Sequence, residues 1–270
     1  MRKMRHLSYG PLKTPVEVTC IRRSCRFIEV LFRHIKPMVR PGVNMKELLR
    51  ICELAMARKK VRPSLELDAG FPYPVSFCLN DVAAHGMPAD YVLRDNDLLT
   101  IDITVALEGW HGDGAWTYLS GKVDEEGRAL VRAAWRCTMA GIRAAVAGGF
   151  VRDIGATIEE EASRVGCSVI PDFAGHGIGR AYHEEPLIYH HGIPGTGLKI
   201  VPGMVFTIEP IVTFGRPEVF KDGTGGFRMR DGSKTAQFEH TVAVFPHHTE
   251  ILTLGRRQYG DDLLREDLFL

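Results

Sequence analysis

Apolar positions near the start of the chain recur with the period of an α-helix. Thr14 is followed three residues later by a glutamate, the sequence pattern of a capping box, and Pro15 falls at the first helical position. This pattern predicts a helix that ends near Pro37. A second helix is expected after Gly42, with Asn44 as its N-cap and apolar residues at helical spacing behind it.

The same order returns in the middle of the chain. Residues 126–149 have a helical pattern that ends at two glycines, and residues 150–166 predict a further helix. Segments rich in β-branched residues follow each helix pair. When Gly42 is matched to Gly149, the two units lie 107 residues apart, so the pattern predicts an internal duplication of a helix–helix–sheet unit.

Five segments have the composition of β-strands: 73–80, 97–109, 110–123, 204–214 and 235–245. They are rich in β-branched and aromatic residues and are bounded by Gly, Pro or Asp. Helices and strands are grouped in runs and do not alternate singly. This grouping favours an α+β fold with a mainly antiparallel sheet.

Composition excludes several classes of protein. The chain has 270 residues and a formal net charge of +1, so no general attraction to nucleic acid or acidic lipid is implied. The first 18 residues contain no apolar run of a secretory signal, and no apolar stretch is long enough to span a bilayer. Six scattered cysteines without a CxxC pair indicate reduced thiols in a cytoplasmic protein.

Acidic residues interrupt the apolar strand segments. Asp102 lies inside such a segment and Asp113 follows eleven residues later. A buried carboxylate is costly unless it is paired, protonated or bound to a metal. A hairpin centred between Leu107 and Glu108 would make the two carboxylates cross-strand neighbours, and their repulsion would call for a positive charge between them.

Two further acids, Glu209 and Glu239, interrupt the later strand segments in the same way. With a histidine they complete a set of five side chains that is hard to explain by structure alone: Asp102, Asp113, His176, Glu209 and Glu239. Four carboxylates carry four negative charges, which two divalent cations would neutralise. Oxygen-rich ligation with one imidazole suits Mn²⁺, Fe²⁺, Co²⁺ or Zn²⁺.

The segment "GHGIGRAYHEEP" places His176 and His183 seven residues apart. On a helix the two imidazoles would share a face, but Gly177 and Gly179 between them make a poor helix. We therefore expect a bending strand or loop that brings the two histidines to different tasks.

Five motifs together resemble the methionine aminopeptidases of the bacterial type, within the pita-bread metallopeptidase family: "CLNDVAAHGMP", "LLTIDITVALEGWHGD", "GHGIGRAYHEEP", "GMVFTIEPIV" and "AQFEHTVAVF". The resemblance extends from about Lys13 to Leu254. It implies a pita-bread fold, in which pseudo-twofold units form a curved, mainly antiparallel sheet covered by helices on one face. It also implies three segments: an extension at 1–12, a catalytic domain at 13–255 and a tail at 256–270.

The resemblance implies a dinuclear metal site. Asp102 would chelate one ion, and Asp113 and Glu239 would bridge two. His176 and Glu209 would complete the second site. A bridging water or hydroxide would then attack the first peptide bond of the substrate, with Glu209 as proton shuttle.

Residues expected to contact substrate follow from the same resemblance. His85 would lie near the scissile amide, and His183 would help to stabilise the tetrahedral intermediate. Phe71, Ser76 and Tyr182 match positions of the methionine pocket. Outside these roles, Thr104 matches a position beside the first metal site.

The sequence departs from the family around this pocket. Ser76 stands where the family commonly has a cysteine, with Cys78 two residues on. The segment 224–226 replaces a family tryptophan that covers the pocket, which leaves Phe227 as its substitute.

The implied setting is a cytoplasmic monomer that acts on nascent polypeptide N-termini. The basic run at 56–60 ends a predicted helix, where lysine complements the helix dipole, so a ribosome contact is a candidate but is not required. His190, His191, His247 and His248 lie beside Gly or Pro or in polar segments and are expected to be solvated. His111 and His240 neighbour proposed ligands, but adjacent strand residues point to opposite faces, so we expect neither to be a ligand.

Two other functions stay open. A prolidase or Xaa-Pro aminopeptidase on the same fold uses a similar set of ligands, although those enzymes usually carry an N-terminal domain for which the stretch before Lys13 has no room. A non-catalytic binding protein of the same fold is the second alternative. Such a protein is expected to have lost ligands, whereas all five are present here.

Overall fold

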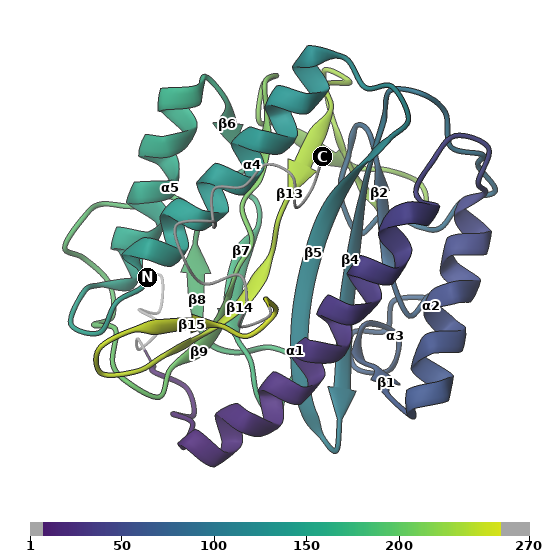
Figure 1. Cartoon of the computed structure of the whole chain (residues 1–270). Helices are drawn as coiled ribbons and strands as arrows, with labels where there is room; N and C mark the ends of the chain where they lie inside the picture. The colour runs from purple at the N-terminus through teal and green to yellow at the C-terminus, as the bar shows by residue number, and fades with distance from the viewer. Residues whose placement is uncertain (1–7, 255–270) are drawn as a thin grey trace.

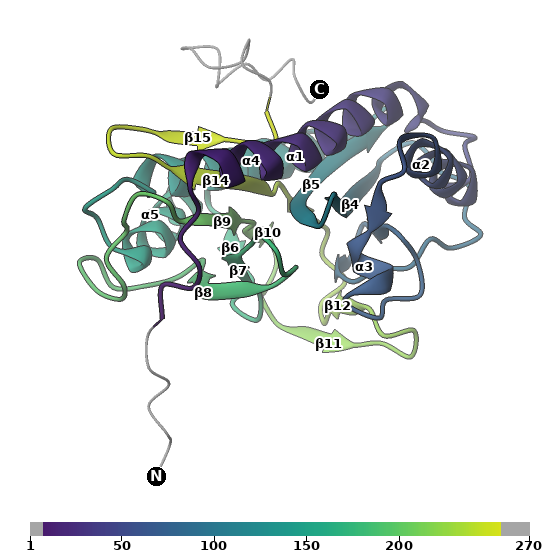
Figure 2. The ribbon, with the colours of Figure 1, turned by 90° about the horizontal axis from the view of Figure 1, so that it is seen from below.

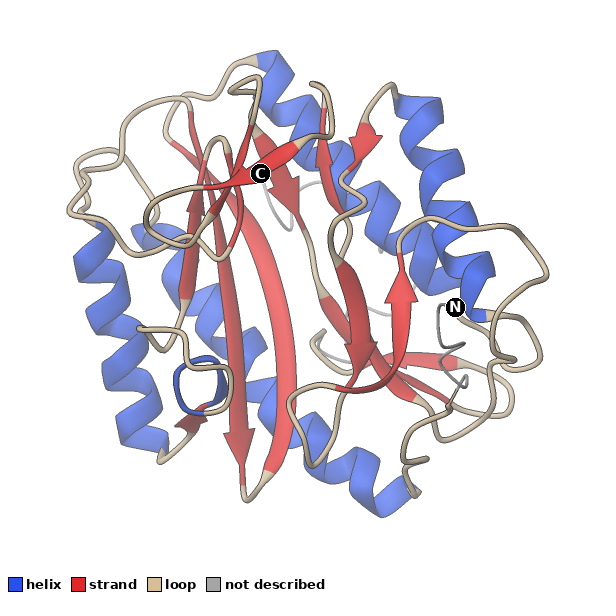
Figure 3. Cartoon of the chain, turned by 180° about the vertical axis from the view of Figure 1, so that it is seen from behind, coloured by secondary structure: helices blue, strands red, loops and turns tan. Residues whose placement is uncertain are grey.

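The computed structural model describes residues 8–254. Two pairs of long helices lie on one side of the β-strands, as Figure 1 and the opposite view in Figure 3 show. The helices are α1 (Pro15–Ile35), the 3₁₀ turn η1 (Lys36–Met38), α2 (Met45–Lys59), α3 (Ser64–Leu67), α4 (Glu125–Ala144) and α5 (Val151–Val165).

The strands are short except for one hairpin. They are β1 (Arg62–Pro63), β2 (Ser76–Leu79), β3 (Val82–Ala84), β4 (Asp97–Leu107), β5 (Trp110–Ser120), β6 (Ser168–Val169), β7 (Ala174–Gly177), β8 (Glu184–Tyr189), β9 (Val205–Ile208), β10 (Ile211–Thr213), β11 (Val219–Lys221), β12 (Phe227–Met229), β13 (Thr235–Gln237), β14 (His240–Val244) and β15 (Thr249–Ile251).

The helix signals in the sequence are confirmed. The Thr14 side chain accepts a hydrogen bond from the backbone N–H of Glu17, and the Glu17 carboxylate accepts one from the backbone N–H of Thr14, so the capping box is formed. The side chain of Asn44 accepts from Lys46 at the start of α2. Both second helices, α2 and α5, have 15 residues, and α1 and α4 have 21 and 20. These matched lengths agree with the predicted duplication.

All of the strand pairs in the described part of the chain are antiparallel. β4 pairs with β1, β2 and β5, and a second sheet has the order β15-β14-β9-β7-β8. Two small sheets, β13-β10-β6 and β11-β12-β3, complete the fold. Figure 2 shows the long helices α1 and α4 along one side and β8, β11 and β12 on the other. The predicted α+β class with an antiparallel sheet is therefore confirmed.

The hairpin between β4 and β5 turns one residue later than expected. Glu108 and Gly109 both have positive φ, as a two-residue type I′ turn requires. Asp102 therefore pairs with Ala115, and the predicted direct pairing with Asp113 is wrong. Asp113 instead pairs with Thr104, two residues after Asp102. Because side chains alternate, both carboxylates still point to the same face.

Two segments that we expected to be single strands are each broken. The segment 204–214 divides into β9 and β10, and the segment 235–245 divides into β13 and β14. Glu209 and Glu239 lie in these two interruptions, between strands and not inside them. The partners match across both breaks, since β9 pairs with β14 and β10 pairs with β13. The two glutamates therefore meet where one sheet gives way to the next.

The core fills the space between the helices and the strands. Phe32 of α1 is fully buried and stacks on Trp116 of β5, with the ring centroids 5.0 Å apart. The hydroxyl of Tyr118 donates to the Phe32 carbonyl at 3.0 Å. These contacts fix α1 across the long hairpin that carries two of the candidate ligands.

The expected terminal segments lie mainly outside the described residues. This applies to residues 1–7 of the predicted extension and to the whole predicted tail, 256–270. Among residues 8–254, no helix has the length and hydropathy needed to cross a bilayer.

Replacing Phe32 by alanine is expected to lower the free energy of unfolding by about 3–5 kcal/mol, because the change leaves a cavity under α1. Val30 on the same helix is 53% exposed and provides the control, since Val30→Ala should cost less than about 0.5 kcal/mol. Urea unfolding followed by circular dichroism measures both. Similar costs for the two variants would contradict the packing described.

Candidate metal centre

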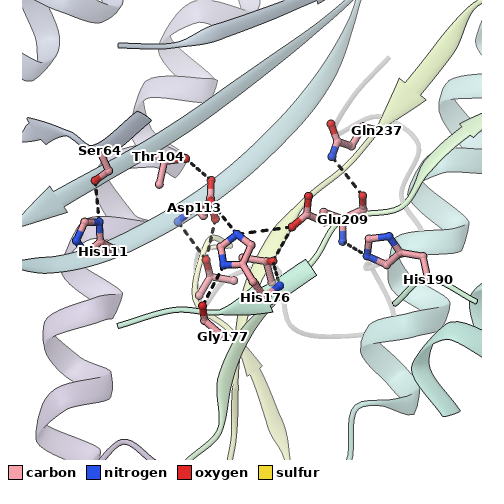
Figure 4. A network of polar contacts seen from close by, with 11 residues as sticks. Ser64, Thr104, His111, Asp113, His176, Gly177, His190, Glu209 and Gln237 are labelled. Atoms are coloured by element: carbon pink, nitrogen blue, oxygen red, sulfur yellow. Dashed lines mark hydrogen bonds and ion pairs between the residues drawn. The ribbon is translucent and has the colours of Figure 1, made fainter. Parts of the chain in front are cut away.

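The five candidate ligands come from five different strands or strand junctions. Asp102 lies in β4, Asp113 in β5 and His176 in β7. Glu209 and Glu239 occupy the interruptions described above. Figure 4 shows Asp113, His176 and Glu209 converging from separate elements of the sheet. The site therefore forms only when the two halves of the fold meet.

Three of these side chains lie close enough to share one ion. One ligand atom from each of Asp113, His176 and Glu239 lies within 4.8 Å of the other two. The His176 Nε2 atom is 3.6 Å from an Asp113 carboxylate oxygen and 3.9 Å from a Glu209 oxygen. Residues 8–254 contain one such group.

A hydrogen bond with the backbone orients the imidazole of His176. Its Nδ1 lies 3.0 Å from the carbonyl oxygen of Gly177, which accepts only if Nδ1 carries the proton. That tautomer leaves the Nε2 lone pair facing the carboxylates. Such a hydrogen bond from the outer nitrogen is typical of a histidine that binds a metal.

Three of the carboxylates, Asp102, Glu209 and Glu239, have a raised pKa. Burial, with the charge of Asp113 added, raises the pKa of both Asp102 and Glu239 well above the ordinary range. The same two causes raise the pKa of Glu209 to about 7. Burial lowers the pKa of His176, but its hydrogen bond with Asp113 and the charge of Glu209 outweigh burial and raise it. A cation within the group would remove these conflicts.

Hydroxyl groups fix two of the carboxylates. Thr104 donates to Asp113 at 2.7 Å, and Thr207 donates to Glu209 at 2.7 Å. By contrast, one oxygen of Asp102 is buried without a hydrogen-bond partner. A buried carboxylate oxygen without a hydrogen-bond partner, among other carboxylates, is suited to bind a cation, so the residues present suit a divalent metal.

His190 supports Glu209, and we did not expect this from the sequence. Its Nε2 accepts a hydrogen bond from the backbone N–H of Glu209 at 3.1 Å, while Gln237 donates to the Glu209 carbonyl at 3.2 Å. Burial lowers the pKa of His190 to about 3, so the ring is neutral and can accept. These side chains replace the sheet hydrogen bonds that Glu209 lacks at the break.

The prediction that His190 is a solvated surface residue is therefore wrong. His190 is completely buried, because it continues the inward-facing set of Pro186 and Ile188 along β8. This alternation was the signal in the sequence. For the other three histidines, His191 is half-buried and only His247 and His248 are exposed.

His111 and His240, which we excluded as ligands, have other partners. The Nδ1 of His111 pairs with Ser64 Oγ at 2.8 Å, and that of His240 pairs with Thr253 Oγ1 at 2.8 Å. The group of candidate ligand atoms contains neither histidine.

The loop after β7 brings His183 and Tyr182 beside the carboxylates. The His183 ring centroid is 4.2 Å from that of His176 and 3.8 Å from that of Tyr182. His183 itself is exposed. Burial of part of the ring, with the charge of His176, lowers the pKa of His183 to about 4. The imidazole is therefore neutral at neutral pH.

His85 lies in a different part of the site wall. Its φ of +53° is unusual for a residue other than glycine and is the kind of backbone strain found at functional sites. Its ring is edge-on to Phe227 at 5.6 Å and to Phe173 at 6.3 Å. Burial, with the charge of Lys221, lowers the pKa of His85. Phe227, the expected substitute for the family tryptophan, therefore does contact this histidine.

The remaining expected pocket residues lie in the first half of the chain. Ser76 is buried in β2 and pairs in register with Asp102, and its hydroxyl donates to the Gly86 carbonyl at 3.2 Å. Phe71 is half-buried, with its ring 6.3 Å from that of Tyr73. Ser76 is therefore placed next to a ligand strand, whereas no contact of Phe71 with the carboxylate group is recorded among the described residues.

Comparison with known proteins agrees with the geometry. Residues 19–246 match the model of metallopeptidase family M24. The chain is 37% identical to a methionine aminopeptidase of Escherichia coli (strain K12) over 249 residues, which cover 91% of this chain and 94% of that protein.

Among solved structures, a methionine aminopeptidase is more similar to this chain than a prolidase is. The methionine aminopeptidase of Rickettsia prowazekii has a TM-score of 0.89 and 32% identity, and the match covers 91% of this chain and all of that one. The prolidase of Pyrococcus furiosus is more distant, with a TM-score of 0.73 and 20% identity over 66% of its chain, and shares the fold. The chain thus belongs to metallopeptidase family M24, whose members are metal-dependent peptidases.

Proposed function

We propose that this chain removes the N-terminal methionine from nascent proteins and peptides, with a preference for a small second residue. The observation that carries the proposal is that Asp113, His176 and Glu239 lie close enough to share one ion, with Glu209 3.9 Å from His176. They do so in a chain that matches methionine aminopeptidases over nearly their whole length. Prolidase neighbours match over only part of their chains.

Two divalent ions, of Co, Mn, Fe or Zn, are proposed for the site. Asp102 would hold the first ion, Asp113 and Glu239 would contact both, and His176 and Glu209 would hold the second. When bound, such ions supply Lewis acidity that makes water more acidic and polarises a carbonyl group. The mutual repulsion of the carboxylates supports this charge requirement.

The protein's own groups would orient the substrate and move protons. Glu209 would take a proton from the attacking water and pass it to the leaving amine. His183 is neutral and beside the carboxylates, so its N–H can donate to the carbonyl oxygen as negative charge develops there. His85 would contact the substrate near the scissile amide.

The methionine side chain would be received by Phe71, Ser76 and Tyr182. The ring of Tyr182 is 5.5 Å from that of His176. The contact between Phe227 and His85 supports Phe227 as part of the cover. We further propose a catalytic domain at 13–255 that works as a cytoplasmic monomer. The ribosome is a candidate partner.

Purified protein supplied with Mn²⁺ or Co²⁺ is expected to release methionine from Met-Ala-Ser and little from Met-Leu-Ser, because only a small second residue would fit. An Xaa-Pro peptide is the matched comparison. Liquid chromatography of the free amino acid measures all three. Preferential cleavage of the Xaa-Pro peptide would favour the prolidase alternative, and no cleavage of any peptide would favour a binding protein.

His85→Ala is expected to lower turnover by about 100-fold or more while the metal content is unchanged, because a substrate contact is lost but no ligand is. His176→Ala and Asp102→Ala should instead lose bound metal, as elemental analysis after desalting would show. Full turnover in metal-replete His85→Ala would remove the role assigned to this histidine.

In the metal-free protein, Glu209 is expected to lower the stability of the folded state as the pH rises. Folded Glu209 holds its proton to about pH 7, whereas its ordinary value is 4.5. Between these values the folded state binds more protons, so stability due to this group falls with increasing pH. Buried histidines with a lowered pKa make stability rise with pH and would mask this effect. Because they are present in both proteins, the quantity to measure is the Tm of the wild type minus that of Glu209→Gln.

This difference is expected to decrease between pH 4.5 and 7.5 without metal and to change much less with Mn²⁺ bound. The variant Glu185→Gln, at an exposed carboxylate, is the control and should track the wild type. An increase of the difference with pH would contradict the raised pKa.

A further inference from the structure

A buried ion pair links the N-terminal segment to the loop that carries His183. The Lys13 ammonium lies 2.5 Å from a carboxylate oxygen of Glu184, and the two side chains are only 3% and 7% exposed. The residues are 171 positions apart in the sequence. Neither belongs to the candidate ligands or to the expected substrate contacts.

Lys13 is held in place from several sides. Its backbone N–H donates to the Gly203 carbonyl at 2.7 Å, and its ammonium also donates to the Pro11 carbonyl at 2.5 Å. The next residue, Thr14, is the N-cap of α1. The ammonium therefore has a fixed position relative to the helix layer.

Glu184 closes the loop at residues 178–183. Its second carboxylate oxygen accepts from the backbone N–H of Ala181 at 3.1 Å, inside that loop. Its backbone pairs with Gly177, the residue that follows His176. A Cβ at Gly179 would lie 2.3 Å from the Lys13 side chain and 2.8 Å from that of Glu184, so the loop folds directly over the ion pair. Glu184 thus connects Lys13 to both ends of the loop.

The position of this loop decides where His183 points. The residue directly precedes Glu184 and is exposed, so little packing besides Tyr182 and His176 holds its ring. A buried ion pair contributes little net stability, because desolvation offsets the attraction, but it imposes a defined geometry when both charges are satisfied. This pair therefore fits a positioning role better than a stabilising one.

We propose that Lys13 and Glu184 are positioning residues that hold the loop 178–183 so that His183 reaches the carbonyl oxygen of the substrate. This inference rests on the proposed function for the role of His183. The ion pair acts through the loop and does not touch substrate.

The decisive experiment combines Glu184→Gln with His183→Ala and measures kcat and KM for a methionyl peptide with Mn²⁺ present. Glu184→Gln alone is expected to lower kcat by about 10- to 100-fold with little change in KM, because a misplaced group loses transition-state contact. In the His183→Ala background the same substitution should lower kcat no further. An equal loss in both backgrounds would overturn the proposal.

Matched variants distinguish the effect of this ion pair from a general effect of removing a charge near the site. Glu185→Gln removes the same charge from the neighbouring, exposed residue and is expected to keep the wild-type kcat. Lys13→Arg retains a cation and should retain more activity than Lys13→Met. Equal losses in Lys13→Arg and Lys13→Met, or a loss in Glu185→Gln as large as that in Glu184→Gln, would also overturn the proposal.

Hydrogen exchange gives a readout that needs no activity. In Glu184→Gln and Lys13→Met, the amides of residues 178–183 should exchange at least 10-fold faster, while those of α4 stay as in the wild type. Unchanged exchange in the loop would contradict the positioning role even if the enzyme is active. Faster exchange in a protein that releases no methionine would instead support the pair and count against the proposed function.

Discussion

Electrostatic repulsion within one small group of carboxylates is the constraint on which the rest of this structure depends. Burial and the charge of Asp113 raise the pKa of Asp102, Glu209 and Glu239, and one oxygen of Asp102 has no hydrogen-bond partner. Such a group is unfavourable inside a protein unless cations neutralise it. The surrounding fold must therefore hold the four side chains together against their own charges.

The fold does this by bringing two half-sheets to a junction. One long hairpin carries Asp102 and Asp113 under α1, whose buried aromatic contacts fix it. The other half supplies His176 and the two glutamates at strand breaks, where side chains such as His190 replace lost sheet hydrogen bonds. Rigid elements on both sides thus define the ligand geometry, while His85 and His183, which are proposed to contact substrate, are exposed.

Much of this could be predicted from the sequence, because local signals agree with the fold. The capping box at Thr14 and the acids inside apolar segments each have a direct physical meaning. The exact hairpin register could not be predicted, since moving a two-residue turn by one position leaves Asp102 and Asp113 on the same face. The strand breaks at Glu209 and Glu239 depend on long-range pairing that no local pattern encodes, whereas the alternation along β8 does indicate that His190 is buried.

The central claim is that five side chains from both halves of the chain form one dinuclear metal centre. Anomalous diffraction from crystals grown with Mn²⁺ tests it most directly. Two adjacent peaks are predicted, both in contact with Asp113 and Glu239, one also with Asp102 and the other with His176 and Glu209. A single peak, or peaks that do not contact these side chains, would contradict the account.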